Sequence, residues 1–158
     1  MPVLAVVSDT HGKLYPEVVA ALAGSDLIVH AGDLGGSEVL DTLEGIAPLV
    51  AVRGNTDTGA WSLRLPPRAE FEWAGVKCLV VHNLAGLGRE RRLIAQGLGE
   101  VRVVIHGHSH RAEAVWSGGV LFFNPGSAGP RRFLLPRTIG RLRVVDGRVV
   151  TEIVEMGR

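Results

Sequence analysis

The chain has 158 residues, of which 46% are hydrophobic and 21% charged, so its composition excludes a disordered protein and indicates a globular one. Its 17 basic and 16 acidic residues leave a net charge of +1, which argues against a long nucleic-acid duplex or an anionic membrane surface as partner. No apolar stretch is long enough to span a bilayer. The single cysteine, Cys78, has no internal disulfide partner, so we expect a reducing, cytoplasmic compartment.

The first third of the chain alternates predicted strands with predicted helices. Apolar runs predict strands over residues 3–7, 27–29 and 49–52, and helical spacing predicts helices over 15–23 and 37–46, the second with Ser37 as its N-cap. This alternation indicates an α/β protein with parallel strands. Ligands of such sheets bind beyond the carboxyl ends of the strands.

The rest of the chain is richer in predicted strands. We expect a loop over 58–67, a hairpin of strands 70–73 and 76–81, a helix over 89–98 and a buried strand over 103–105. Two further hairpins are predicted over 112–123 and 139–154, the second turning at Asp146-Gly147. No linker or repeat interrupts the chain, so we expect a single domain over residues 1–158.

Polar residues with metal-ligand chemistry follow the apolar strands one after another. In chain order they are Asp9, His11, Asp33, Asn55, His82, His108 and His110. Carboxylate and imidazole together suit Mn²⁺, Fe, Zn²⁺, Co²⁺ or Ni²⁺, whereas Ca²⁺ prefers more oxygen ligands and structural Zn²⁺ prefers cysteine. The set is too large for one transition metal with an open position, and it suits two metals that share a bridging carboxylate.

The ordered motifs resemble those of the calcineurin-like metallophosphoesterase superfamily, in particular its small single-domain bacterial and archaeal phosphodiesterases. The motifs are Asp9-Thr10-His11, Gly32-Asp33, Gly54-Asn55-Thr56-Asp57, His82, Gly107-His108-Ser109-His110 and Asn124-Pro125-Gly126-Ser127. The resemblance implies a four-layer α/β/β/α sandwich of two mixed β-sheets flanked by helices. It also implies that one metal takes Asp9, His11 and His110, the other takes Asn55, His82 and His108, and Asp33 bridges them.

The implied activity is hydrolysis of a small phosphodiester by a metal-bound hydroxide, without a protein nucleophile. Asp33, Asn55 and His82 would then lie at the centre of catalysis. Mn²⁺ is the first expectation for the two metals, with Ni²⁺, Co²⁺, Fe and Zn²⁺ as alternatives. Two other functions stay open: a phosphomonoesterase, and a non-catalytic metal-binding scaffold that binds protein partners, because the fold also occurs in a retromer subunit that binds proteins. A homodimer is likewise left open.

One position departs from the pattern of the superfamily. Thr56 stands where many members have a histidine that helps to protonate the leaving group. We therefore expect a preference for substrates with good leaving groups.

Other residues beside the motifs are predicted to support the site. Arg53, Arg131 and Asn124 are the predicted substrate contacts. His30 and His106 are predicted to be core residues or to orient a ligand, and Asp57 to be a cap or an acceptor behind the ligands.

Overall fold

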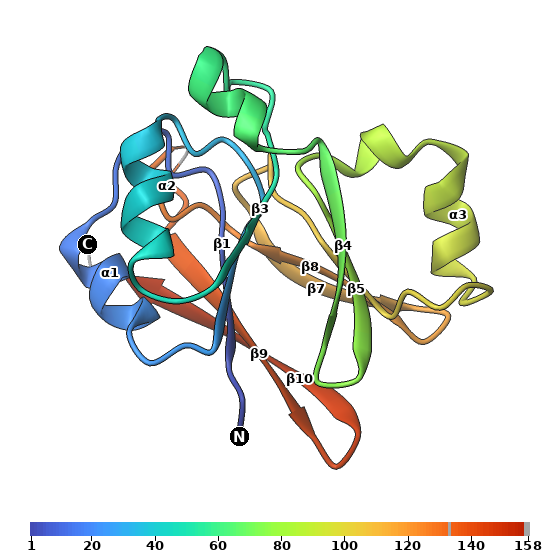
Figure 1. The fold of residues 1–158 in the computed structure, drawn as a ribbon. Coiled ribbons are helices and arrows are strands. Elements are labelled where there is room, and N and C mark those ends of the chain that lie inside the picture. The colour runs from blue at the N-terminus through green and yellow to red at the C-terminus, as the bar shows by residue number, and fades with distance from the viewer. Residues whose placement is uncertain (133, 157–158) are drawn as a thin grey trace.

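The first of two sheets contains both ends of the chain. A computed structural model describes residues 1–132 and 134–156, shown in Figure 1. Strands β1 (Leu4–Val7), β2 (Leu27–His30), β3 (Leu49–Ala51), β9 (Arg137–Val145) and β10 (Arg148–Met156) form a five-stranded sheet in the order β10-β9-β1-β2-β3. β1, β2 and β3 are parallel, whereas β9 and β10 are antiparallel to their neighbours.

The second sheet comes from the middle of the chain. Its strands are β4 (Arg68–Trp73), β5 (Val76–Val81), β6 (Val103–Ile105), β7 (Ala112–Ser117) and β8 (Val120–Pro125), in the order β4-β5-β6-β8-β7. β5, β6 and β8 are parallel, and an antiparallel strand lies at each edge. Both sheets are therefore mixed.

Helices cover the outer faces of the two sheets. Helices α1 (Pro16–Leu22) and α2 (Ser37–Glu44) lie against the first sheet and α3 (Arg89–Ala95) against the second, as Figure 1 shows. Within β1, Ala5 and Val7 pack toward the helices, while Leu4 and Val6 pack into the core between the sheets, because successive side chains of a strand point to opposite faces. The predicted four-layer α/β/β/α sandwich is confirmed.

Several element boundaries differ from those predicted. Gly36, and not Ser37, is the N-cap of α2, and Ser37 is its first helical residue. Short 3₁₀ helices η1 (Ala60–Arg64) and η2 (Leu84–Leu87) lie in segments that sequence patterning assigns to loops. α3 ends at Ala95 instead of residue 98, because Gly97 adopts a left-handed backbone conformation with φ 73°.

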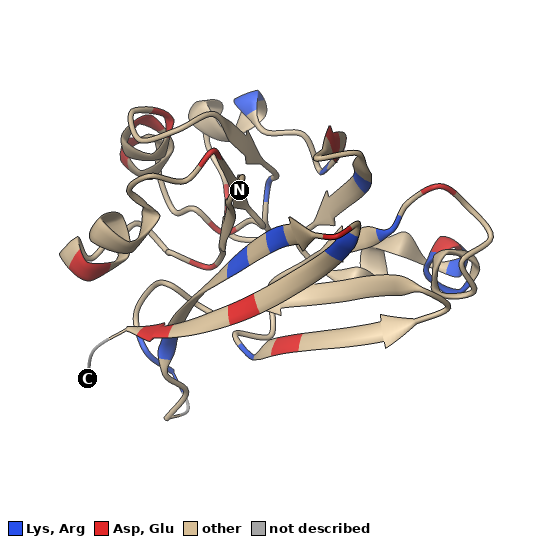
Figure 2. Ribbon diagram, turned by 90° about the horizontal axis from the view of Figure 1, so that it is seen from below, with Lys and Arg blue, Asp and Glu red and all other residues tan. Residues whose placement is uncertain are grey.

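The two ends of the strands carry different connections. The hairpin turns of β4–β5, β7–β8 and β9–β10 all lie at the end where β1, β2, β5 and β6 begin. The loops that follow β1, β2, β3, β5 and β6 lie at the opposite end. Acidic residues mark α1 and α2, whereas α3 carries arginines together with Glu90, so both signs of charge are distributed over the fold (Figure 2). No helix among the described residues combines the length and apolar character needed to cross a membrane. The cytoplasmic location stays a prediction.

Candidate metal centre

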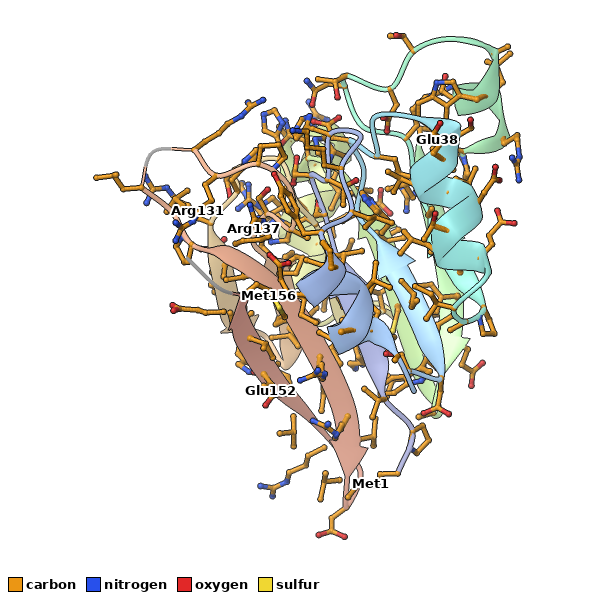
Figure 3. The ribbon with its side chains drawn as sticks, turned by 90° about the vertical axis from the view of Figure 1, so that its left-hand side faces the viewer. Met1, Glu38, Arg131, Arg137, Glu152 and Met156 are labelled. Atoms are coloured by element: carbon orange, nitrogen blue, oxygen red, sulfur yellow. The ribbon has the colours of Figure 1, made fainter. Side chains whose placement is uncertain are left out.

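The predicted ligands converge at the carboxyl ends of the parallel strands of both sheets. Side chains from the loops after β1, β2, β3, β5 and β6 meet there, and Figure 3 shows nitrogen- and oxygen-bearing side chains crowded at that end. Two groups of side chains place their donor atoms within 4.8 Å of one another: Asp9 with His11 and His110, and Asp9 with Asp33 and His82.

Asp9 is fully buried, and its two carboxylate oxygens have different surroundings. Its Oδ2 accepts hydrogen bonds from the Ser8 hydroxyl at 2.7 Å and from the backbone N–H of His108 at 3.1 Å. Its Oδ1 has no hydrogen-bond partner among the described residues, yet it lies 3.4 Å from Nε2 of His110 and 3.7 Å from Nε2 of His11. One oxygen thus fixes the carboxylate, and the other faces the imidazoles.

Asp33 is held in the same way, one oxygen to the backbone and one toward imidazoles. Its Oδ1 accepts the backbone N–H of Thr56 at 3.0 Å. Its Oδ2 lies 3.2 Å from Nε2 of His82 and 3.8 Å from Nε2 of His11. Asp33 therefore stands between a histidine of one group and a histidine of the other.

The tautomer of His82 follows from its backbone contact. Nδ1 lies 2.8 Å from the carbonyl oxygen of Ala31, which can only accept, so Nδ1 carries the hydrogen. Nε2 of the neutral ring then presents a lone pair to the cluster, which is how metal-binding histidines are commonly oriented.

His108 and Asn55 complete the exposed side of the cluster. Nδ1 of His108 donates to the amide oxygen of Asn55 at 3.2 Å, and the His108 ring meets that of His82 edge to face at 5.2 Å between centroids. On the buried side, the rings of His11 and His110 lie 5.4 Å apart. All residues predicted as ligands are thus present in one cluster.

Most of these residues have an uncommon backbone conformation. Positive φ angles occur at Asp9 (55°), His11 (47°), Asp33 (60°), His108 (72°) and His110 (63°). A positive φ is sterically unfavourable for any residue that has a Cβ atom. It is retained where the surrounding structure holds the residue in that conformation. The sharp turns after the strands direct these side chains into a common space.

Asp57 fixes the loops after β2 and β3. Its buried carboxylate accepts the backbone N–H groups of Asp33, Leu34, Gly35 and Gly54 at 2.9–3.2 Å. The prediction that Asp57 is an acceptor behind the ligands is confirmed.

Asn124 fixes the loop after β6. Its amide nitrogen donates to the carbonyl of Gly107 and to Oγ of Ser109, both at 3.1 Å, and its amide oxygen accepts the N–H of Gly126. The side chain is fully buried, so its contacts support a role in positioning the histidine loop. The substrate contact stays a prediction.

The unpaired atoms of the cluster are those that a cation would need. Asp9 Oδ1, His11 Nε2 and His82 Nε2 are buried without a hydrogen-bond partner among the described residues. Buried polar atoms are normally hydrogen-bonded, and carboxylate oxygens facing imidazole nitrogens are the ligands of divalent transition metals. The residues present therefore fit a metal.

Electrostatics keep the carboxylates ionised. Burial alone would raise the pKa of Asp33, but the close approach of His82 and the N–H of Thr56 outweigh burial and hold the pKa well below its ordinary value. The same balance, with His110 and Ser8 as partners, lowers the pKa of Asp9. Burial would lower the pKa of His82, but Asp33 and Asp9 raise it.

Comparison with known proteins identifies the family. The family model described as "Calcineurin-like phosphoesterase superfamily domain" matches residues 3–147. The chain belongs to this superfamily. A probable metallophosphoesterase of Methanocaldococcus jannaschii is 35% identical over 151 residues, which cover 90% of this chain and 76% of the relative. Membership of the superfamily supports metal-dependent phosphoesterase activity on a small substrate.

Solved structures share the calcineurin-like fold. An archaeal phosphodiesterase matches with a TM-score of 0.75 at 23% identity, covering 96% of this chain and 99% of its own. Wild-type Vps29 from Entamoeba histolytica, solved in complex with Zn²⁺, matches with a TM-score of 0.70 at 25% identity, covering 97% and 98%.

The two remaining histidines lie outside the two groups of side chains that could hold a metal ion, although Nε2 of His106 is also buried without a hydrogen-bond partner among the described residues. His30 is fully buried; its Nδ1 accepts the N–H of Gly32, and its Nε2 contacts the Thr10 hydroxyl at 3.0 Å, so it holds the loops after β1 and β2 as a core residue. Burial lowers its pKa to about 4. His106 is buried as well, and burial together with Arg91 lowers its pKa to about 4.

Arginines surround the calcineurin-like site on two sides. Arg53 is half-buried and Arg131 is exposed, on the loop beside the crowded end in Figure 3. Arg132 was not predicted, although its charge acts on His11, whose pKa is lowered mainly by burial. The doublet Arg131-Arg132 was the signal available in the sequence. The substrate contacts of Arg53 and Arg131 stay predictions.

Thr56 contributes through its backbone. Its N–H holds Asp33, while the residue itself is exposed. The preference for good leaving groups stays a prediction.

Proposed function

We propose that the protein is a phosphodiesterase that uses two divalent transition-metal ions, with Mn²⁺ as the first expectation and Ni²⁺, Co²⁺, Fe or Zn²⁺ as alternatives. The observation that carries the proposal is a set of buried donor atoms around one space that have no hydrogen-bond partner in the part of the chain that the structure describes: Asp9 Oδ1, His11 Nε2 and His82 Nε2. A structural relative that was solved in complex with Zn²⁺ supports a divalent ion in a protein of this fold.

In this proposal the ligands divide into two sets. Asp9, His11 and His110 hold one ion, and Asn55, His82 and His108 hold the other. Asp33 bridges them, which its position between His82 and His11 supports. Asp9 Oδ1 also lies 3.8 Å from Nε2 of His82, so Asp9 is close to a histidine of each proposed ligand set.

The residues of the chain prepare this site for a phosphodiester. Two bound ions supply a water molecule of lowered pKa and withdraw charge from the phosphoryl group. The backbone N–H groups of Thr56 and His108 orient the two carboxylates, and Ala31 fixes the ring of His82. Arg53 and Arg132 add positive charge at the rim, where an anionic substrate arrives.

Two alternative functions can be tested on the same protein sample. A phosphomonoesterase would share the metal site and differ in substrate, while a scaffold would need the fold without turnover. The archaeal phosphodiesterase among the structural relatives supports the diesterase. The unpaired donor atoms support metal binding, which a diesterase and a metal-binding scaffold share, so turnover decides between these two functions.

The test combines metal reconstitution with one ligand substitution. Chelated protein receives Mn²⁺, Ni²⁺, Co²⁺, Zn²⁺ or Mg²⁺ singly, and hydrolysis of bis-p-nitrophenyl phosphate is compared with that of p-nitrophenyl phosphate. We expect a transition metal to restore diester hydrolysis, and Asp33→Asn to reduce it about a thousandfold, since Lewis-acid stabilisation is worth several kcal/mol. The exposed carboxylate of Asp41 on α2 gives a matched control, Asp41→Asn, expected to have no effect.

Metal content is measured on the same samples by mass spectrometry. About two ions per chain without hydrolysis of either ester would favour the scaffold, and faster hydrolysis of the monoester would favour the phosphomonoesterase. Protein that binds no transition metal would overturn the proposal altogether.

A further inference from the structure

A pocket opens beside the exposed half of the metal centre. It has a volume of about 470 Å³ and lies between the loop after β3 and the segment from β5 to η2. Asn55 and His82, two of the proposed ligands, form part of its lining. A group esterified to a phosphate at the metal centre therefore has this pocket as its immediate neighbour.

The size and the walls of the pocket suit an organic group. Pro67, Val81 and Leu87 contribute apolar walls. Binding sites for small organic molecules commonly have volumes of about 300–1,000 Å³. The pocket is thus large enough for a nucleoside or sugar and larger than a simple alkyl group requires.

Two arginines line this pocket, and only one has acidic partners. The guanidinium of Arg68 contacts Glu90 at 2.8 and 3.0 Å and Glu70 at 3.3 Å, so its charge is balanced within the protein. Arg53 has no carboxylate within 4.0 Å and no side-chain hydrogen bond in the part of the chain that the structure describes. Its backbone N–H donates to the carbonyl of Pro66 at 2.9 Å, which fixes the residue at the pocket wall.

We propose that the pocket binds one alcohol moiety of the diester substrate and that Arg53 pairs with a second anionic group on that moiety. The second anion is a phosphate monoester or a carboxylate, and the body of the moiety packs against Pro67, Val81 and Leu87. The inference rests on the proposed phosphodiesterase function and names its substrate class. A guanidinium group pairs bidentately with both kinds of anion. A half-buried cation is less screened by water than an exposed one, so such a pair is stronger there.

The experiment uses pairs of substrates that share one leaving group. The p-nitrophenyl ester of thymidine 5′-phosphate is compared with the same ester carrying a 3′-phosphate, and p-nitrophenyl propyl phosphate with p-nitrophenyl 2-carboxyethyl phosphate. We expect kcat/KM of the full-length, metal-loaded protein to favour the more anionic member of at least one pair about tenfold to a hundredfold, the strength of a charge-assisted hydrogen bond. The pair that shows the preference identifies the anion.

The variant Arg53→Ala is expected to bring that preference ratio close to 1, and Arg53→Lys to restore part of it. Arg148→Ala, at the opposite end of the strands, is the matched control and should keep both the ratio and the rates. Calorimetric titration with thymidine 3′,5′-bisphosphate against thymidine 5′-phosphate gives a second readout that needs no turnover.

The possible outcomes separate the two proposals. Equal rates on both members of each pair would overturn the second-anion site and leave the phosphodiesterase standing. Equal losses of rate on both members in Arg53→Ala, with an unchanged ratio, would show that Arg53 holds the reacting phosphate instead. No hydrolysis of any diester with any metal would overturn the phosphodiesterase, and with it this inference.

Discussion

The same unusual backbone conformation occurs at both ends of the strands, for different reasons. At the hairpin end, Ala74 and Asp146 have φ of 50° and 51° and each precedes a glycine in a two-residue turn. At the site end, Asp9, Asp33 and His108 have φ of 55–72° and each carries a candidate ligand. Positive φ closes a hairpin in the first case. In the second case it aims a side chain, and the neighbouring loops must hold it there.

The two ends also differ in how their polar groups are used. Asp26, at the hairpin end, accepts one exposed N–H, that of Val3, at 2.7 Å. Asp57, at the site end, accepts N–H groups from two loops and is buried. The same residue type is a local support in one place and the anchor of a functional loop in the other.

The largest effect on stability is expected from removing that anchor. Asp57→Ala leaves several buried N–H groups without an acceptor, so we expect the free energy of unfolding to fall by about 4 kcal/mol. Asp26→Ala, the matched substitution, should cost less than about 1 kcal/mol, because water replaces the lost partner. Urea unfolding of both variants measures the contrast, and equal losses would contradict it.

A smaller effect on stability is expected when the pH is lowered, because of the buried ring of His30. Its pKa is about 4 in the folded protein against an ordinary 6.5, so between these pH values the unfolded chain binds the proton and the folded chain does not. Stability is therefore lost as pH falls through this window, by about 2–3 kcal/mol for this residue between pH 7 and 4.5. Urea unfolding in the presence of a chelator should show a shallower pH dependence in His30→Asn. An unchanged slope would mean that the buried ring does not cause the effect.

The smallest effect is expected at the hairpin end. Ala74→Gly relieves a positive φ in an exposed turn and should raise the free energy of unfolding by about 0.5 kcal/mol. It should leave metal content unchanged. His108→Gly relieves the same conformation but removes an imidazole, so metal content should fall. Calorimetric stability and metal content are measured on both variants. They test whether the positive φ can be relieved without loss of metal at the hairpin end but not at the site end.

The fold was predictable because its signals are local and repeated. Alternating strands and helices, followed by hairpins with Asp146-Gly147 and Ala74-Gly75 turns, indicate an α/β protein, whereas the arrangement of two sheets between helices was implied by the resemblance to the superfamily. Helix ends were less predictable. Gly36 displaced Ser37 as N-cap, and the left-handed turn at Gly97 shortened α3, because tertiary packing decides both.

The candidate ligands could be predicted from the sequence where a polar residue comes directly after a predicted strand, since parallel strands bring their carboxyl ends to one edge of the sheet. Details that depend on three-dimensional contacts were not predictable. No pattern in the sequence shows that Arg68 is neutralised by Glu90 while Arg53 has no such partner among the described residues, or that the charge of Arg132 acts on His11. The extent of the domain, the native metal and the oligomeric state stay predictions.

The atoms that shape the loops are distinct from those that would bind metal. Asp57 and Asn124 fix backbone groups, Ser127 donates to the carbonyl of Asp9, and none of these contacts uses an unpaired donor atom of the cluster. A substitution at a ligand that makes no such contact to a loop, such as His11, therefore leaves these contacts intact. A lineage that exchanges His11 for another side chain keeps the loops in place, and the same framework then becomes available for a different ligand or for none.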